Sequence, residues 1–276
     1  MNLYSEENQL RIKYILIALI SLFSWFFLGG MVSYTLSLSI NGKLQRFILL
    51  FIPHVILFLS LFISVKVILK RSLLSLISEK KVNIKEELLV AVITLLVIGF
   101  FSLFSYKTIT KNNTTSLNEK LLFFLVSLPL LLIQTLSEEL LFRVLPIKIY
   151  SPIKKAISKK ELISLSLIEG IVFLLPHLSN KEVLESQNSI YAIITYFLWG
   201  YGLCFISLYY SSFVSSWVMH FVNNLFSSAI VGSVNSTLDS SPLFIDTSIS
   251  YSPLILINTI VLFFVIFLFK KKGKSK

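Results

Sequence analysis

Apolar runs of about 20 residues, the length that a membrane-spanning helix needs, recur along the whole chain. They constrain its fold more than any other feature. Hydrophobic residues make up 55% of the 276 residues, and the mean hydropathy is +0.82. The runs do not alternate between apolar and polar residues, as the strands of a transmembrane β-barrel would. The pattern therefore predicts an all-α polytopic membrane protein.

We expect about eight transmembrane helices in a single membrane domain that covers residues 1–276. The expected spans are 14–36, 47–69, 87–106, 121–145, 161–178, 189–209, 212–232 and 252–269. A tight polar turn near Ser211 and Ser212 separates the sixth span from the seventh. The first run has no small-residue cleavage site after a short apolar core, so we interpret it as a retained span.

The net charge of +11 does not indicate nucleic-acid binding, because of where the charges lie. Lys and Arg cluster in the short loops 70–85 and 148–160 and in the tail 270–276, whereas the loop 233–251 contains Asp239 and Asp246 and no Lys or Arg. Basic residues favour the cytoplasmic side of a membrane. We therefore predict a plasma-membrane protein with both termini in the cytoplasm.

The single cysteine, Cys204, lies inside an apolar run. It excludes a disulfide within the chain and a metal site built from paired cysteines.

Two adjacent carboxylates and an arginine interrupt the fourth apolar run: Glu138, Glu139 and Arg143. Charged side chains at membrane depth are costly and usually functional. Glu139 and Arg143 are four residues apart, so on a helix they can pair on one face. Glu169, in the fifth run, is a further intramembrane acid that either extends a polar cavity or pairs with another span.

Two of the three histidines also lie deep in expected spans. His177 ends the fifth span, four residues after Phe173, and His220 shares a helix face with Asn224. We interpret His54, which follows Pro53 early in the second span, as a structural or interfacial residue. Trp217 is interpreted as packing or lipid-facing surface.

Three motifs follow one another on these spans: Glu138-Glu139-x-x-x-Arg143, Phe173-x-x-x-His177 and His220-x-x-x-Asn224. Together they resemble the CPBP family, the CAAX-protease and bacteriocin-processing intramembrane endopeptidases also called the Abi family. The resemblance covers about residues 121–232 as a catalytic core. It implies an eight-helix bundle that hydrolyses a peptide bond of a membrane-associated or peptide substrate.

The resemblance also implies roles for the motif residues. A carboxylate in an apolar cavity binds protons more tightly than one in water, which suits a general base near neutral pH. By resemblance Glu138 is that base, His177 helps to hold the water, and His220 and Asn224 stabilise the oxyanion. The supporting residues are Glu139, Arg143 and Phe173.

The alternative to a metal-free reaction is a zinc site with Glu138, His177 and His220 as ligands, since a catalytic zinc takes three protein ligands and one open position. The sequence has no His-Glu-x-x-His motif. The resemblance favours a glutamate-dependent reaction with no cofactor.

Two other classes of function compete with a protease: a non-enzymatic membrane scaffold that regulates a sensor kinase, and a transporter. No visible repeat supports the transporter. The sequence does not identify the peptide substrate, and processing of a bacteriocin or pheromone peptide and self-immunity all agree with it.

One expectation conflicts with a shared site. At about 1.5 Å per residue, Glu138 and His220 lie about 10–12 Å from the inner ends of their spans, whereas His177 falls near an outer end.

Overall fold

The computed structural model describes residues 3–78, 81–104, 108–152, 157–234, 236–238, 240–247 and 253–274. In chain order its elements are α1 (Leu3–Phe23), η1 (Ser24–Gly29), α2 (Gly30–Ser37), α3 (Lys43–Leu49), α4 (Ile52–Ser64), η2 (Val65–Leu69), α5 (Leu74–Ile77), α6 (Ile84–Leu103), β1 (Ile109–Lys111), α7 (Leu117–Glu139), η3 (Leu140–Val144), α8 (Leu145–Tyr150), α9 (Lys159–His177), α10 (Lys181–Leu184), α11 (Ser189–Tyr210), α12 (Val214–Ala229), β2 (Val231–Ser233), β3 (Phe244–Asp246) and α13 (Pro253–Lys274). The η segments are π-helical. The predicted all-α class is confirmed.

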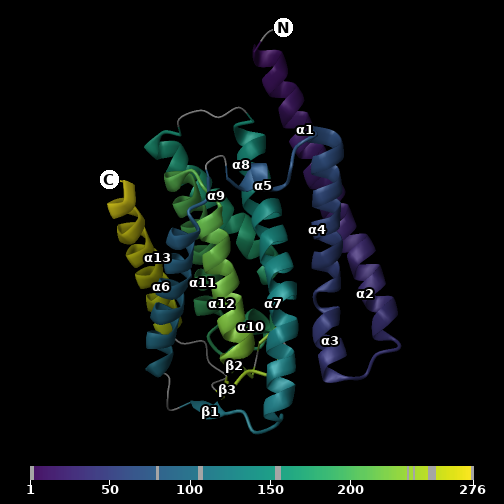
Figure 1. Ribbon diagram of the computed structural model, residues 1–276, viewed down its shortest axis with the longest axis vertical. Coiled ribbons are helices and arrows are strands. Elements are labelled where there is room, and N and C mark those ends of the chain that lie inside the picture. The colour runs from purple at the N-terminus through teal and green to yellow at the C-terminus, as the bar shows by residue number, and fades with distance from the viewer. Residues whose placement is uncertain are drawn as a thin grey trace.

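The long helices run side by side along the longest axis of the molecule (Figure 1). The N-terminal helices α1 to α4 form one side of the bundle, and α6, α11 and α13 form the other. Between them stand α7 and α12, which pack against each other. These two helices carry most of the motif residues, so the site lies in the middle of the bundle.

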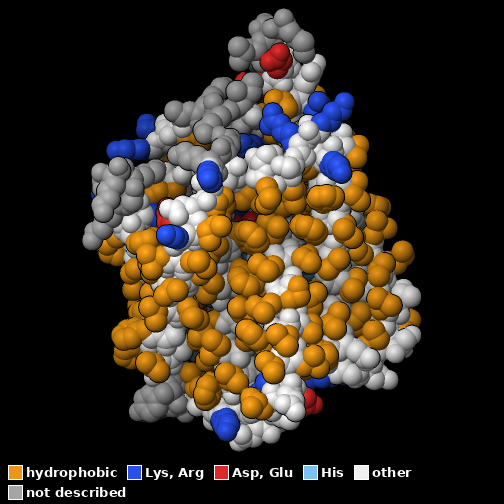
Figure 2. Space-filling view, in the orientation of Figure 1, with side chains coloured by type: hydrophobic (Ala, Val, Ile, Leu, Met, Phe, Trp, Pro, Cys, Tyr) orange, Lys and Arg blue, Asp and Glu red, His pale blue; other side chains and the backbone are white. Residues whose placement is uncertain are grey.

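Six of the eight expected spans are confirmed as helices long and apolar enough to cross a membrane, counted over the described residues. They are Ser5–Ser37, Lys43–Leu69, Ile84–Leu103, Leu117–Tyr150, Ser189–Tyr210 and Pro253–Lys271. Exposed apolar side chains cover the middle of the face in Figure 2, and Lys and Arg side chains gather near its ends. This surface suits a lipid bilayer.

The other two expected spans are helices in the expected places, but they are shorter or more polar. α9 has 19 residues and includes Glu161 and Glu169. α12 has 16 residues, a length of about 24 Å against a hydrocarbon core of about 30 Å. Both bury polar side chains against neighbouring helices, and the same residues lower their hydropathy.

α7 and α9, which position site residues, begin with the same capping motif. The Glu119 backbone N–H donates to Ser116 Oγ over 3.2 Å, and the Glu119 carboxylate accepts from the Ser116 N–H over 2.7 Å. Ser158 and Glu161 repeat this pair before α9. Such reciprocal bonds satisfy N–H groups that the first helical turn leaves without partners.

The predicted polar turn between the sixth and seventh spans is confirmed. α11 ends at Tyr210, and the next residue, Ser211, has a left-handed backbone with φ of 55°. The Ser212 N–H then donates to the Ser207 carbonyl over 3.0 Å, which satisfies a carbonyl of the last helical turn. The chain reverses there and enters α12.

A small three-stranded sheet, which the sequence did not predict, closes one end of the bundle (Figure 1). β3 lies in the centre, antiparallel to β1 and parallel to β2. The Asn112 side chain adds a hydrogen bond to the Pro242 carbonyl over 2.9 Å. Strands of three residues are too short to leave an alternating pattern in the sequence.

Both ends of the chain lie toward the opposite end of the bundle from this sheet (Figure 1). This agrees with an even number of membrane crossings. The side of the membrane stays a prediction, and several positions in the charged loops that support it, 79–80, 105–107, 153–156, 239 and 275–276, lie outside the described residues.

Candidate active site

The last two residues of α7 are buried carboxylates. Glu138 is 5% exposed and Glu139 is 1% exposed. The chain continues directly into η3, all of whose residues are buried. π-helical turns inside α-helices are often found at functional sites, and this one separates Glu139 from α8.

Arg143, in η3, is fully buried and forms the expected ion pair with Glu139 through Nη1 and Oε1. Its Nε and Nη2 atoms have no hydrogen-bond partner within the described part of the chain. The guanidinium lies 4.5 Å from the centre of the Phe173 ring. One carboxylate and one aromatic face therefore hold this charge in the protein interior.

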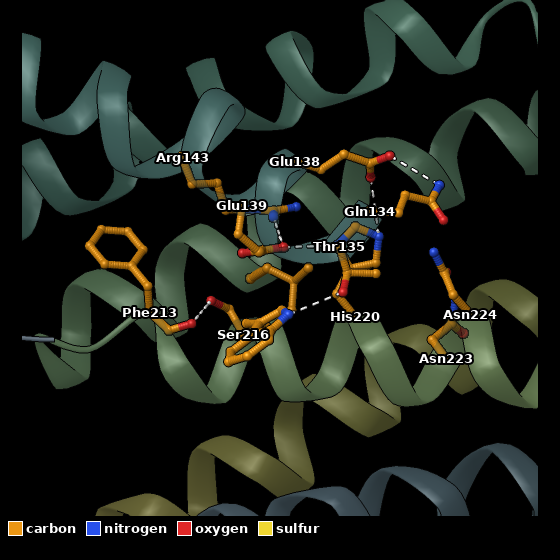
Figure 3. A network of polar contacts seen from close by, with 12 residues as sticks. Gln134, Thr135, Glu138, Glu139, Arg143, Phe213, Ser216, His220, Asn223 and Asn224 are labelled. Atoms are coloured by element: carbon orange, nitrogen blue, oxygen red, sulfur yellow. Dashed lines mark hydrogen bonds and ion pairs between the residues drawn. The ribbon is translucent and has the colours of Figure 1, made fainter. Parts of the chain in front are cut away.

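His220, on α12, lies between the two carboxylates (Figure 3). Its Nδ1 is 2.9 Å from Glu139 Oε1, and its Nε2 is 3.5 Å from Glu138 Oε2. The ionised Glu139 can only accept a hydrogen bond, so Nδ1 carries a proton. His220 then has a proton on Nε2 only when it is an imidazolium.

Glu138 has two further partners that the sequence analysis did not place at the site. Gln134, one turn earlier on α7, donates from Nε2 to Glu138 Oε1 over 3.1 Å. His54 Nε2 lies 3.1 Å from the same oxygen. His54, which was interpreted from the sequence as a structural or interfacial residue, therefore contacts the proposed base.

His177 lies in the same cavity wall as Glu138 and His220. It is half-buried, and its Nδ1 is 2.6 Å from the Phe173 carbonyl. Its ring packs between Phe173 and Tyr196, with 4.4 Å between ring centres on either side. His177 is the last residue of α9, and its side chain still lines the same cavity as Glu138 and His220 despite the expected difference in depth.

Asn224 lies one turn after His220 on α12, as predicted, and Asn223 lies beside it (Figure 3). Both line the cavity, and Asn223 Nδ2 donates to Asn224 Oδ1 over 3.3 Å. This contact leaves the Asn224 amide protons available as donors. The structure thus brings all four proposed catalytic residues to one cavity.

About one turn before His220, hydrogen bonds fix α12 against two neighbouring helices. Trp217 Nε1 donates to Thr135 Oγ1 of α7 over 3.1 Å, so Trp217 has a specific partner and is more than packing surface. On the other side, Ser207 Oγ of α11 donates to Ser216 Oγ over 2.7 Å. The register of α12, and with it the position of His220, is set by these contacts.

Glu169, on α9, is 2% exposed, and its Oε2 has no hydrogen-bond partner among the described residues. The charges of Arg143 and Glu139 act on it across the interior. Glu169 therefore belongs to the same buried charge cluster, although it does not line the cavity.

The cavity has a volume of about 1350 Å³ and extends from the carboxylates to the small sheet. Most of its lining is apolar or aromatic. Its acidic lining residues are Glu138, Glu182 and Asp246, and none of the described residues that line it is Lys or Arg. An anionic ligand would therefore meet carboxylates there and no ammonium or guanidinium group of the described residues.

The zinc alternative requires three side chains that converge on one point. Within the described residues no group of three or more His, Cys, Asp or Glu side chains could hold a metal ion. The imidazoles of His54 and His220 instead face the two carboxylates directly. The reaction proposed below is written without a metal.

The bundle and its buried cluster define a multi-pass membrane protein in which carboxylate and imidazole groups face an internal cavity. Residues 120–226 match the family model described as type II CAAX prenyl endopeptidase Rce1-like. This part of the chain is therefore a domain of that protease family, close to the expected core. No curated protein and no solved structure matches the chain.

Proposed function

We propose that the protein is an intramembrane endopeptidase that hydrolyses a peptide bond of a membrane-associated or peptide substrate. The observation that supports this most directly is Glu138, a buried carboxylate in the cavity wall with an imidazole beside each oxygen. Peptide hydrolysis needs a base that activates water and donors that stabilise an oxyanion. Residues of both kinds surround this one cavity.

In the first step, Glu138 accepts a proton from water, and the water oxygen forms a bond to the carbonyl carbon of the scissile peptide. His177 helps to hold the water. The carbonyl oxygen becomes an oxyanion, to which His220 Nε2 and the Asn224 amide donate. In the second step the carbon–nitrogen bond breaks, and the departing amine takes the proton from Glu138.

Glu139 and Arg143 support this reaction through His220. Since Nδ1 of His220 donates to Glu139, the ring needs its second proton to stabilise an oxyanion. The carboxylate of Glu139 stabilises that imidazolium, and Arg143 holds the carboxylate in place. Their role is to orient the imidazole of His220 and to stabilise its protonated form.

The cavity favours an extended peptide as substrate. Its volume of about 1350 Å³ exceeds the usual 300–1,000 Å³ of small-molecule pockets. Its largely apolar walls suit a segment drawn from a lipid bilayer. Processing of a bacteriocin or pheromone peptide, or a part in self-immunity, would each supply such a substrate.

We further propose that the chain is a single membrane domain in the plasma membrane with both termini in the cytoplasm and a catalytic core at about residues 121–232. The uneven distribution of Lys and Arg in the loops supports this orientation.

The test is Glu138→Gln, which keeps the shape of the side chain but cannot act as a base. We expect a loss of at least about 10²-fold in the cleavage rate of a fluorogenic peptide library by purified protein in liposomes. Asn224→Ala should lose about 10²–10³-fold through the oxyanion. Membrane insertion should be unchanged in both.

Glu185→Gln is the matched control, because it makes the same chemical change at an exposed position after α10. It should cleave like the wild type. A Glu138→Gln protein that inserts normally and supports the full cellular phenotype would refute the protease and favour a scaffold.

A further inference from the structure

A side chain from the N-terminal part of the chain reaches the proposed base. His54 lies in the first turn of α4, outside the family-matched residues 120–226. Its side chain is 16% exposed and lines the cavity, with Nε2 3.1 Å from Glu138 Oε1. The Trp25 ring of η1 packs beside it, with ring centres 5.6 Å apart. The imidazole is thus fixed between η1 and α7.

The ionisation of Glu138 determines which group donates the hydrogen bond between His54 and Glu138. The base acts as an ionised carboxylate, which can only accept hydrogen bonds, so His54 Nε2 carries the proton and donates it. Nδ1, the other ring nitrogen, has no hydrogen-bond partner in the described part of the structure. The whole polar contribution of this ring is therefore its bond to Glu138.

The two oxygens of Glu138 have different surroundings. Oε1 receives two donors, His54 Nε2 and Gln134 Nε2, each at 3.1 Å. Oε2 has no hydrogen-bond partner among the described residues, and its nearest polar neighbour in the cluster is His220 Nε2 at 3.5 Å. Oε1 thus accepts two hydrogen bonds, whereas Oε2 is buried and keeps its acceptor capacity unused by the described residues.

We propose that His54 is a positioning residue for the peptidase reaction: together with Gln134 it holds Oε1, so that Oε2 is the oxygen that takes the proton from water. This inference rests on the proposed function. The proton passes from water to Oε2 and later from Oε2 to the departing amine, while His54 keeps its own proton throughout. A fixed carboxylate reaches the reactive geometry without losing rotational freedom during the step.

A purely structural His54 would make a different prediction. If the residue only filled space beside Trp25, any aromatic ring of similar size would replace it. If it positions Glu138, a donor at the place of Nε2 is what matters. Phe and Gln separate the two roles, because Phe keeps the ring and loses the donor, whereas the Gln side chain can place its amide N–H near Nε2.

The experiment compares His54→Phe and His54→Gln as purified full-length protein in liposomes, with kcat and KM measured on the peptide that the wild type cleaves. We expect His54→Phe to lose about 10- to 100-fold in kcat, the effect of one hydrogen bond to a charged group, with KM unchanged. His54→Gln should recover most of this loss. Ser60→Ala is the control on the same helix, because its hydroxyl has no hydrogen-bond partner among the described residues, and it should match the wild type.

Wild-type kcat in His54→Phe would overturn the proposal, and so would an equal loss in both variants, since the ring and not the donor would then matter. Should His54→Phe fail to insert, His54→Met removes the donor with a more flexible side chain and carries the same prediction. Different results would refute the positioning role of His54 and the peptidase function. Inactive Glu138→Gln beside fully active His54→Phe would leave the peptidase intact, whereas equal activity of the wild type and Glu138→Gln would refute the peptidase itself.

Discussion

At the residue scale, Arg143 is the side chain on which the buried cluster most depends. It is fully buried, and Glu139 is its ion-pair partner. Removal of one member of a buried pair leaves an uncompensated charge and costs about 3–5 kcal/mol. We therefore expect Arg143→Ala to lower the unfolding temperature in detergent and the amount of protein in the membrane, together with activity.

A double substitution separates stability from catalysis at this pair. Glu139→Gln with Arg143→Met removes both charges, so it should recover most of the protein level and thermal stability that Arg143→Ala loses. It should not recover cleavage, because a neutral amide no longer stabilises the His220 imidazolium. A double variant less stable than Arg143→Ala would show that the pair is not the source of the loss.

Side chains that neighbour each other along a helix could be predicted from the sequence. The pair of Glu139 and Arg143 and the shared face of His220 and Asn224 follow from a spacing of four residues. Gln134 has the same spacing from Glu138 and could have been found in this way. His54 could not, because only the packing of α4 against α7 brings it to Glu138, and no local pattern encodes that contact.

At the element scale, Lys270 joins the C-terminal helix α13 to the rest of the bundle. It is 6% exposed, and its Nζ lies 2.8 Å from Glu86 Oε1 of α6 and 2.6 Å from Ser215 Oγ of α12. Hydrogen bonds to a charged group contribute about 1.5–3 kcal/mol each, less where a partner is part-exposed. We expect Lys270→Met to lower the unfolding temperature and to make α13 more sensitive to limited proteolysis.

Lys271→Met is the matched control, since Lys271 is the next residue of the same helix and is exposed. It should unfold like the wild type. Equal unfolding temperatures for the two variants would mean that contacts other than those of Lys270 hold α13 in place.

The sequence predicts some of the helices more clearly than others. Six spans follow from apolar length alone, which lipid contact requires. The helices α9 and α12 are expected on the same grounds, although their polar residues make them poor spans by composition. The π-helical segments and the short strands depend on tertiary packing, so no periodic pattern in the sequence predicts them.

At the scale of the whole molecule, one cavity joins the parts of the chain. Its walls come from the N-terminal helices, the family-matched region and α13. The family-matched residues 120–226 contain the motifs, but they lack the N-terminal wall of the cavity, which supplies Trp25 and His54. The first helices are part of the cavity wall and more than a membrane anchor.

The orientation of the whole bundle gives the last prediction. α6 has 20 residues, about 30 Å, and so matches the thickness of the hydrocarbon core. Ser75 lies in α5, the short helix before α6, and Asn113 follows β1, the strand after α6; both are exposed. With basic loops in the cytoplasm, a cysteine at Asn113 should react with an impermeant maleimide in intact cells, and a cysteine at Ser75 only after permeabilisation.

The wild type should not react, because its single cysteine, Cys204, is buried. The reverse pattern would place both termini outside, and labelling of both positions from one side would remove α6 as a span.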